Sequence, residues 1–208
     1  MPRPILRPSS SARGERTRAA ILRAATTVFA RHGYHGGPLA AVATAAELTQ
    51  PGLLHHFASK EHLLIAVLEE RDQEAQRRLD DGPWTEGGAA ALDALQELVD
   101  RNGTSPELVQ MFTVLVGESV ADGHPARAFF THRYASLRRR TVVAIRRGQD
   151  SGEFRADVDA DALAALVLAV MDGLQIQWLL DRDIDMGRRF AVFTDMMKRF
   201  LGPSAVSS

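Results

Sequence analysis

The segment Thr49-Gln-Pro-Gly-Leu-Leu-His-His-Phe-Ala-Ser-Lys60 combines a short helix, a stop and a second helix start. Thr49 can cap the short helix through its hydroxyl, and Pro51 suits the first turn, where a backbone N–H has no partner. Leu53 and Phe57 lie four residues apart, so both can face a core. The other polar side chains then face outward; these are Gln50, His55, His56 and Lys60. A short helix with free N-terminal side chains is typical of helix-turn-helix proteins, which insert it into the major groove of DNA.

Helix breakers divide the rest of the chain into further segments with helical apolar periodicity. No strand-length alternating run and no internal repeat occur in the 208 residues, so the sequence predicts an all-α protein of nine helices. The predicted helices cover about 15–32, 39–46, 49–57, 60–79, 89–101, 105–121, 125–149, 159–181 and 186–201.

The segment 80–88, with the sequence DDGPWTEGG, is rich in turn residues and predicts a linker between a small head and a larger helical bundle. Residues 1–14 are rich in Pro, Ser and Arg, and we expect them to form a flexible basic arm. The predicted domains are this arm, a three-helix helix-turn-helix head at 15–60, and a C-terminal helical domain at 61–208.

Charge is distributed unevenly along the chain, although the formal net charge is only −1. Residues 1–62 carry eight Lys and Arg against three Glu, a net of +5, whereas residues 63–208 carry seventeen basic and twenty-three acidic residues, a net of −6. A basic head on an acidic body indicates a polyanionic partner for the head alone. The alternative is chance scatter combined with a disordered tail.

Several function classes are excluded or disfavoured by the composition. Cysteine is absent, which excludes disulfides, thiolate metal sites and cysteine catalysis and fits a cytoplasmic protein. No run approaches the ~18 to 20 uninterrupted apolar residues of a membrane span, and no apolar signal region follows the N-terminal arginines. Asp157, Asp159 and Asp161 begin like a calcium loop but lack its Gly and Glu. With no metal cluster, phosphate loop or nucleophile motif in the sequence, we expect no enzyme, no metal site and no cofactor.

The two C-terminal helices are more apolar than one small core requires. The stretch Ala162–Met171 is apolar almost all the way round, and the last helix has a wide apolar arc. A second copy of the chain can cover this excess, which predicts a homodimer through the last two helices. The candidate interface residues are Leu166, Val170, Phe193, Met197 and Phe200. The alternative is that both helices are central in a monomeric bundle.

The pattern of residues 15–70 resembles the DNA-binding head of tetracycline-repressor-type (TetR/AcrR) regulators. The matching residues are Ala24-Ala25, Phe29-Ala30, Gly33-Tyr34, Val42-Ala43, Ala46, the run Leu53-Leu54-His55-His56-Phe57-Ala58-Ser59-Lys60-Glu61, and Leu63. Beyond the linker, the chain resembles the subgroup with a BetI-type C-terminal domain. This second, weaker match rests on His124-Pro125, Gly-Glu-Phe at 152–154, and Asp172-Gly173-Leu174. The resemblance implies a regulator whose C-terminal domain dimerises and senses a small molecule.

Three positions depart from the family pattern. Gly37-Pro38 stands where most members open the second helix with a phosphate-binding Thr or Ser. Pro51-Gly52 replaces the frequent Gly-Thr pair, so that a hydroxyl contact is missing, and Leu54 replaces an aromatic residue. These changes put three ordinary DNA contacts in doubt and leave the helix and its basic surroundings intact.

The predicted DNA contacts fall into base and phosphate contacts. The amide of Gln50 can bond adenine N6 and N7, and Pro51 offers an apolar face to a thymine methyl. His55 and His56 can donate to phosphates, with His56 at the family's phosphate-side position, and Lys60 can bind a phosphate at a helix start. The full predicted set is Thr49, Gln50, Pro51, Gly52, Leu54, His55, His56, Lys60, Tyr34 and Arg16. Solvated side chains are the alternative throughout, and Tyr34 can instead close the head's core. Arg3, Arg7, Arg13 and Arg18 are further arm candidates for the minor groove or phosphates.

Apolar and aromatic residues of the C-terminal domain provide a candidate effector pocket, with ordinary core packing as the alternative. They are Met111, Phe112, Val116, Phe129, Phe130, Tyr134, Met171 and Trp178. This lining indicates a largely apolar effector. The resulting hypothesis is a homodimeric repressor that binds a palindromic operator in double-stranded DNA and is released by a small molecule. The alternative is a helical ligand-binding or interaction protein without specific DNA binding.

Overall fold

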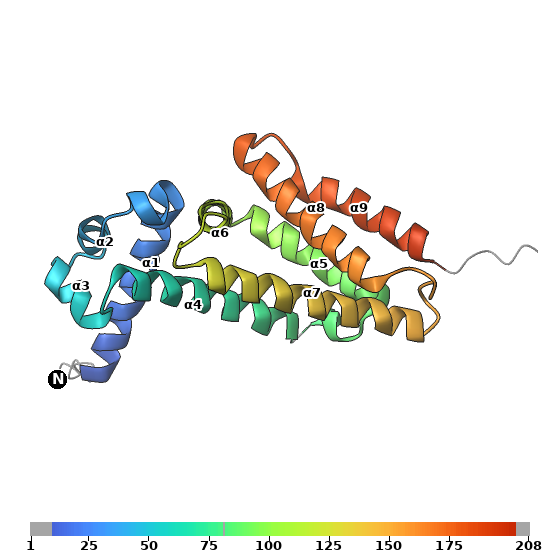
Figure 1. The fold of residues 1–208 in the computed structure, drawn as a ribbon, viewed down its shortest axis with the longest axis horizontal. Coiled ribbons are helices and arrows are strands. Elements are labelled where there is room, and N and C mark those ends of the chain that lie inside the picture. The colour runs from blue at the N-terminus through green and yellow to red at the C-terminus, as the bar shows by residue number, and fades with distance from the viewer. Residues whose placement is uncertain (1–9, 81, 203–208) are drawn as a thin grey trace, which may run out of the picture.

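The computed structural model describes residues 10–80 and 82–202, and within these ranges the chain is all-α, as predicted (Figure 1). The described residues form nine α-helices and one short 3₁₀ helix. Their bounds are α1 Ser10–Gly36, α2 Leu39–Ala45, α3 Gln50–His56, α4 Lys60–Asp80, η1 Pro83–Thr85, α5 Gly88–Gly103, α6 Pro106–Ser119, α7 Arg127–Asp150, α8 Ala160–Leu180 and α9 Met186–Leu201. Figure 1 shows α1–α3 at one end of an elongated molecule and α8 and α9 toward the other.

Helix α1 begins earlier than the sequence indicated. Residues 10–14 are helical, so the predicted arm is wrong for this part, whereas residues 1–9, with Arg3 and Arg7, lie outside the described residues. The expected stop at Gly33 is confirmed. Gly33 has a φ of 65°, a left-handed conformation that favours glycine, and it interrupts α1 before its last turn.

Aspartate side chains fix the starts of the two C-terminal helices. Asp159 Oδ1 accepts the amide N–H groups of Asp161 and Ala162, and Asp185 Oδ1 accepts that of Arg188. These carboxylates are therefore helix caps, placed where negative charge complements the helix dipole.

Two apolar cores stabilise the molecule. The junction core joins the head helices to the first part of the body; its members include Ile21, Leu22, Phe29, Leu53, Leu63, Leu64, Leu68, Met111, Leu115 and Phe130. The body core lies between α5, α7, α8 and α9; its members include Leu95, Val99, Ile145, Val167, Met171, Trp178, Phe190, Met197 and Leu201. The boundary between the two cores therefore does not coincide with the linker 80–88. Helix α6 and the start of α7 follow this linker, yet they complete the core of the head.

Helices α8 and α9 retain exposed apolar side chains: Leu166, Ile176, Leu180, Val192, Met196 and Phe200. By length and composition α8 is apolar enough to cross a membrane, with a mean hydropathy of 1.7, but Asp161 and Asp172 interrupt it. Only 28% of this stretch is buried within the protomer. One correction concerns Met197, which was expected at a subunit interface and is instead buried in the body core.

Candidate nucleic-acid interface

A tight turn positions α3 against the head. Glu47 adopts a left-handed φ of 57°, and the amide of Leu48 donates to the carbonyl of Ala43 over 2.8 Å. Thr49 then caps α3, because its Oγ1 accepts the amide N–H of Gly52 over 3.2 Å, as the sequence predicted. Leu53 is completely buried in the junction core, which fixes the rotation of this seven-residue helix.

The opposite face of α3 is open to solvent. Gln50, Pro51, Leu54 and His55 are exposed, and His56 is half-buried. The rings of His55 and His56 meet edge to face with their centroids 5.7 Å apart. The predicted outward orientation is confirmed for Gln50 and His55, whereas His56 and Lys60 are only partly exposed, and the individual base and phosphate contacts remain predictions.

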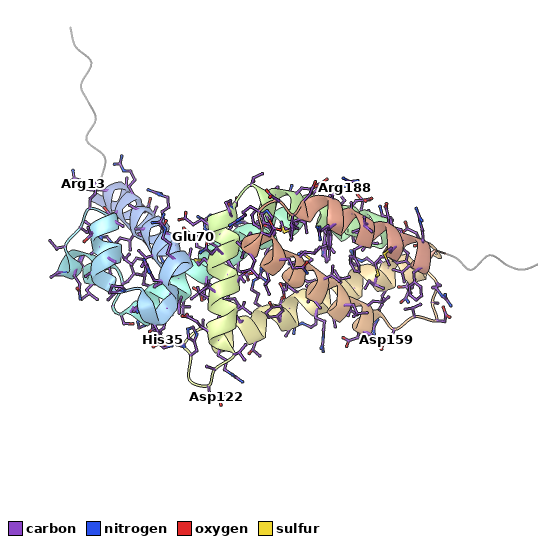
Figure 2. All side chains as sticks on the ribbon, turned by 90° about the horizontal axis from the view of Figure 1, so that it is seen from above. Arg13, His35, Glu70, Asp122, Asp159 and Arg188 are labelled. Carbon is purple, nitrogen blue, oxygen red and sulfur yellow. The ribbon has the colours of Figure 1, made fainter. Side chains whose placement is uncertain are left out.

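Three of the arginines predicted to contact DNA lie on α1, although Arg13 was expected in the arm at 1–14. Arg13, Arg16 and Arg18 are exposed on this helix, and Figure 2 places Arg13 at the outer end of the head. The guanidinium of Arg18 lies 4.9 Å from the ring centroid of Phe57, the residue that ends α3. Arg18 therefore brings positive charge to the end of α3 through a cation–π contact.

Lys60 is held close to the end of α1. Its Nζ lies 4.6 Å from the ring centroid of Tyr34 and donates to the carbonyl oxygen of His35 over 3.4 Å. Burial lowers the pKa of Lys60, and the negative charge of Glu118 opposes this shift. Burial, followed by the charge of Glu61, raises the pKa of Tyr34. Lys60 is therefore a partly buried, oriented cation at the start of α4.

The end of α6 contacts the same region of α1. Glu118 Oε2 accepts the amide N–H of Tyr34 over 2.7 Å. The carboxylate lies so close to Gly33 that a Cβ at that position would be 2.1 Å from Glu118 Oε1. Figure 2 shows α6 crossing the molecule between head and body, with His35 and Asp122 near the same end of this helix. Sequence reasoning missed this contact, because no local pattern connects residues 84 positions apart.

His124 completes this junction from the α6–α7 turn. Its Nδ1 accepts the amide N–H of Ala126 over 3.2 Å and lies 3.0 Å from Ser119 Oγ. Its Nε2 is buried and lies 3.6 Å from Glu118 Oε2. Burial lowers the pKa of His124, Glu118 raises it, and His35 lowers it further. The neutral ring with the proton on Nε2 fits this environment, because Nδ1 is an acceptor.

The first departure from the family pattern has a structural counterpart. Pro38 occupies the cap position of α2 and supplies no side-chain hydrogen bond to the helix. Gly37 cannot be replaced freely, because a Cβ there would lie 2.9 Å from the carbonyl oxygen of Gly33. The start of α2 thus has close backbone packing in place of a hydroxyl group.

The residues predicted to form one effector pocket belong to two regions. Met111 is completely buried in the junction core, and Phe112, Val116, Phe129 and Tyr134 pack against that core. Met171 and Trp178 belong to the body core, and Trp178 lines a cavity between α5, α8 and α9 that contains none of the other predicted residues. A single pocket formed by the whole set is therefore wrong.

A polar pair connects α7 to α8 beside the predicted pocket residues that pack against the junction core. The hydroxyl of Tyr134 donates to Asp172 Oδ2 over 2.6 Å. Burial raises the pKa of both groups, and the bond from Tyr134 and the charge of Arg133 oppose the shift at Asp172. Arg133 in turn forms an ion pair with Asp72 of α4, with Nε 3.0 Å from Oδ1.

An exposed recognition helix on a basic three-helix head, joined to a helical body, defines a DNA-binding regulator. Residues 21–67 match the family model "Bacterial regulatory proteins, tetR family", and residues 88–202 match "BetI-type transcriptional repressor, C-terminal". The chain belongs to the tetR family and is a DNA-binding transcriptional regulator.

Similar proteins agree with this assignment. The HTH-type transcriptional repressor NicS of Pseudomonas putida is 35% identical over 155 residues, which are 69% of this chain and 68% of NicS. Among solved structures, Salmonella enterica GusR has a TM-score of 0.71 at 26% identity and covers 89% of this chain and 95% of its own. FadR of Bacillus subtilis, solved in complex with stearoyl-CoA, shares the fold with a TM-score of 0.74 at 16% identity, covering 88% of this chain and 98% of its own.

Proposed function

We propose that the protein is a cytoplasmic repressor that binds a palindromic operator as a homodimer and is released by a largely apolar small molecule. The observation that carries this proposal is the exposed face of α3, whose rotation is fixed by the burial of Leu53. Gln50 lies at the N-terminal end of that face, where recognition helices contact base edges. Arg13, Arg16 and Arg18 on α1, with Lys60 at the start of α4, supply the charge for phosphate contacts.

The proposed effector site lies between α6, α7 and α8. Phe112, Val116 and Phe129 are half-buried apolar side chains on this side of the body, and the Tyr134–Asp172 pair adds one oriented polar contact. The stearoyl-CoA of the fold relative FadR supports a ligand with a large apolar part. A ligand here can influence the head, because α6 also carries the Glu118 contact to Tyr34. Only a ligand with different affinities for two arrangements of α6 can change DNA affinity.

The proposed dimer interface consists of the exposed apolar side chains of α8 and α9. Leu166 and Phe200 of the predicted set are more than half exposed, and Ile176, Leu180, Val192 and Met196 extend the same surface. Covering this surface with a second copy removes apolar area from water and places two heads on one operator.

The decisive experiment is binding of the full chain to DNA from the region flanking its own gene, measured by fluorescence anisotropy at low and moderate salt. A sequence-preferring complex with a two-fold symmetric footprint is expected. Binding that depends on charge but not on sequence would support the alternative, a helical ligand-binding or interaction protein without specific DNA binding. Repeating the titration with candidate metabolites identifies the effector as the compound that lowers operator affinity.

A further inference from the structure

The cavity lined by Trp178 lies at the end of the body where α5 stops and α8 turns into α9. Its volume is about 320 Å³, within the range of small-molecule sites. Its apolar wall includes Val99, Trp178 and Met186, each at most 8% exposed. This cavity is distinct from the proposed effector site, because none of its lining residues comes from α6 or α7.

Two carboxylates line the same cavity. Asp100 Oδ1 accepts an N–H of the Gln96 side chain over 2.9 Å, and Asp185 Oδ1 accepts the amide N–H of Arg188 over 2.9 Å. Both aspartates are exposed, and among the described residues neither forms an ion pair with Lys or Arg. Together with Arg182, which also lines the cavity, they leave the lining with a net charge of −1, which favours a positively charged occupant over an anionic one.

Arg182 shows independently which chemistry the aromatic wall accepts. Its guanidinium carbon lies 4.1 Å from the ring centroid of Trp178, in a cation–π contact. Arg182 is exposed and lies in the α8–α9 turn, and no carboxylate among the described residues pairs with it. The side chain is therefore a weakly held internal cation, and an external cation with an apolar part can replace it.

Gln96 does not itself line the cavity, but its side chain is bonded to two of the lining residues. Its Nε2 donates to Asp100 and to the carbonyl oxygen of Gly187 over 3.0 Å, both of which line the cavity. Its Oε1 is buried and has no hydrogen-bond partner. Gly187 is required for this packing, because a Cβ would lie 2.3 Å from Asp100 Oδ1. Asp100 and Asp185 thus supply carboxylate acceptors beside the ring of Trp178, which suits a ligand that donates N–H groups.

We propose that this cavity binds a small organic monocation of the alkylguanidinium or alkylammonium class. The cationic head lies over Trp178 in the position that Arg182 occupies, and Asp100 and Asp185 neutralise it. The apolar part of the ligand contacts Val99 and Met186. The proposal does not depend on DNA binding, because every group that it uses lies in the body.

The test uses the full chain with Trp84→Phe, which leaves Trp178 as the only tryptophan. Its fluorescence is titrated with n-butylguanidinium at fixed ionic strength, and the neutral near-isostere n-butylurea is the matched ligand control. A saturable change with the cation and none with the urea is expected. Arg182→Gln is expected to tighten binding by about 3-fold or more, because the internal competitor is removed.

Charge variants of the wall complete the test. Asp100→Asn and Asp185→Ser, the second of which preserves a capping side chain, are each expected to weaken binding by about 5-fold or more. Asp183→Asn removes the same charge from the same turn at an exposed position outside the cavity lining and is expected to change binding by less than about 2-fold. Absence of a saturable signal in both the Trp84→Phe protein and its Arg182→Gln variant, checked by calorimetry, overturns the proposal. Equal responses to n-butylguanidinium and n-butylurea overturn it as well.

Discussion

Gln50 is the first residue of α3 and Lys60 is the first residue of α4. The two side chains are expected to make different contributions to operator binding. Gln50→Ala removes a side chain that can read one base, so discrimination at one operator position is expected to fall by about 1–3 kcal/mol. Lys60→Ala removes an oriented cation, so affinity for every sequence falls and the slope of log K against log salt decreases by about 1. Anisotropy titrations on an operator library at several salt concentrations measure both effects. An unchanged salt slope for Lys60→Ala would falsify its phosphate contact.

Among the glycines of the head, Gly33 is the one where an added methyl group meets the closest neighbour. Gly33→Ala places a Cβ 2.1 Å from the Glu118 carboxylate on a backbone with φ of 65°. We expect a loss of about 2 kcal/mol or more in the free energy of unfolding, from left-handed strain and from displacement of Glu118 from the Tyr34 amide. Urea denaturation measures the loss. Gly36→Ala is the matched control, because its nearest contact is an ordinary 3.6 Å; equal stability of the two variants contradicts the role given to Gly33.

At the scale of elements, we expect His124 in the α6–α7 turn to make the free energy of unfolding depend on pH. Burial lowers the pKa of His124 in the folded protein below its ordinary value of about 6.5. The unfolded chain therefore binds a proton first, and stability falls as pH decreases below about 6.5 until His124 also protonates in the folded state. His124→Asn retains an acceptor for the Ala126 amide and is expected to flatten this dependence. Denaturation midpoints between pH 7.5 and 5 test it.

The matched control for the pH experiment is His132→Asn, which replaces an exposed imidazole on α7. This variant is expected to keep the wild-type slope. If His124→Asn retains the full pH dependence while His132→Asn loses it, the assignment to the α6–α7 turn is wrong.

The sequence predicted several elements to within a residue, because their boundaries are local. Thr49 as a cap and Gly33 as a stop both depend on neighbouring residues, and the start of α3 follows from the Thr49 cap. The start of α1 was missed because residues 10–14 have the composition of a flexible segment.

The candidate site could be predicted from the sequence only in part, because some of its contacts join helices that are distant in the chain. The Glu118–Tyr34 contact and the division of the pocket residues between two cores depend on how distant helices pack. The same limit explains why Met197 was wrongly predicted to lie at the subunit interface. A wide apolar arc on a helix does not indicate which of its side chains faces the protomer's own core.

At the scale of the whole molecule, the apolar surface of α8 and α9 predicts the oligomeric state. Leu166→Glu combined with Met196→Glu introduces two charges into the exposed apolar surface, and we expect a folded monomer with the helical content of wild type. Val143→Glu is the matched control, because Val143 is half exposed on α7, outside this surface. Sedimentation velocity measures the assembly. A wild-type monomer, or a dimer that survives the double substitution, contradicts the proposed interface.

The junction core also determines how the chain can be divided. Met111 and Leu115 of α6 are completely buried against the head helices, so a fragment ending at the linker would lack part of its own interior. Such a fragment would expose the apolar faces that α6 covers, and it would not be a smaller version of the DNA-binding protein. The head and α6 therefore form one cooperative unit, in which unfolding of either removes the other's support. In this protein the head is completed by α6, which also borders the proposed effector site, so replacing either part requires repacking the core between them.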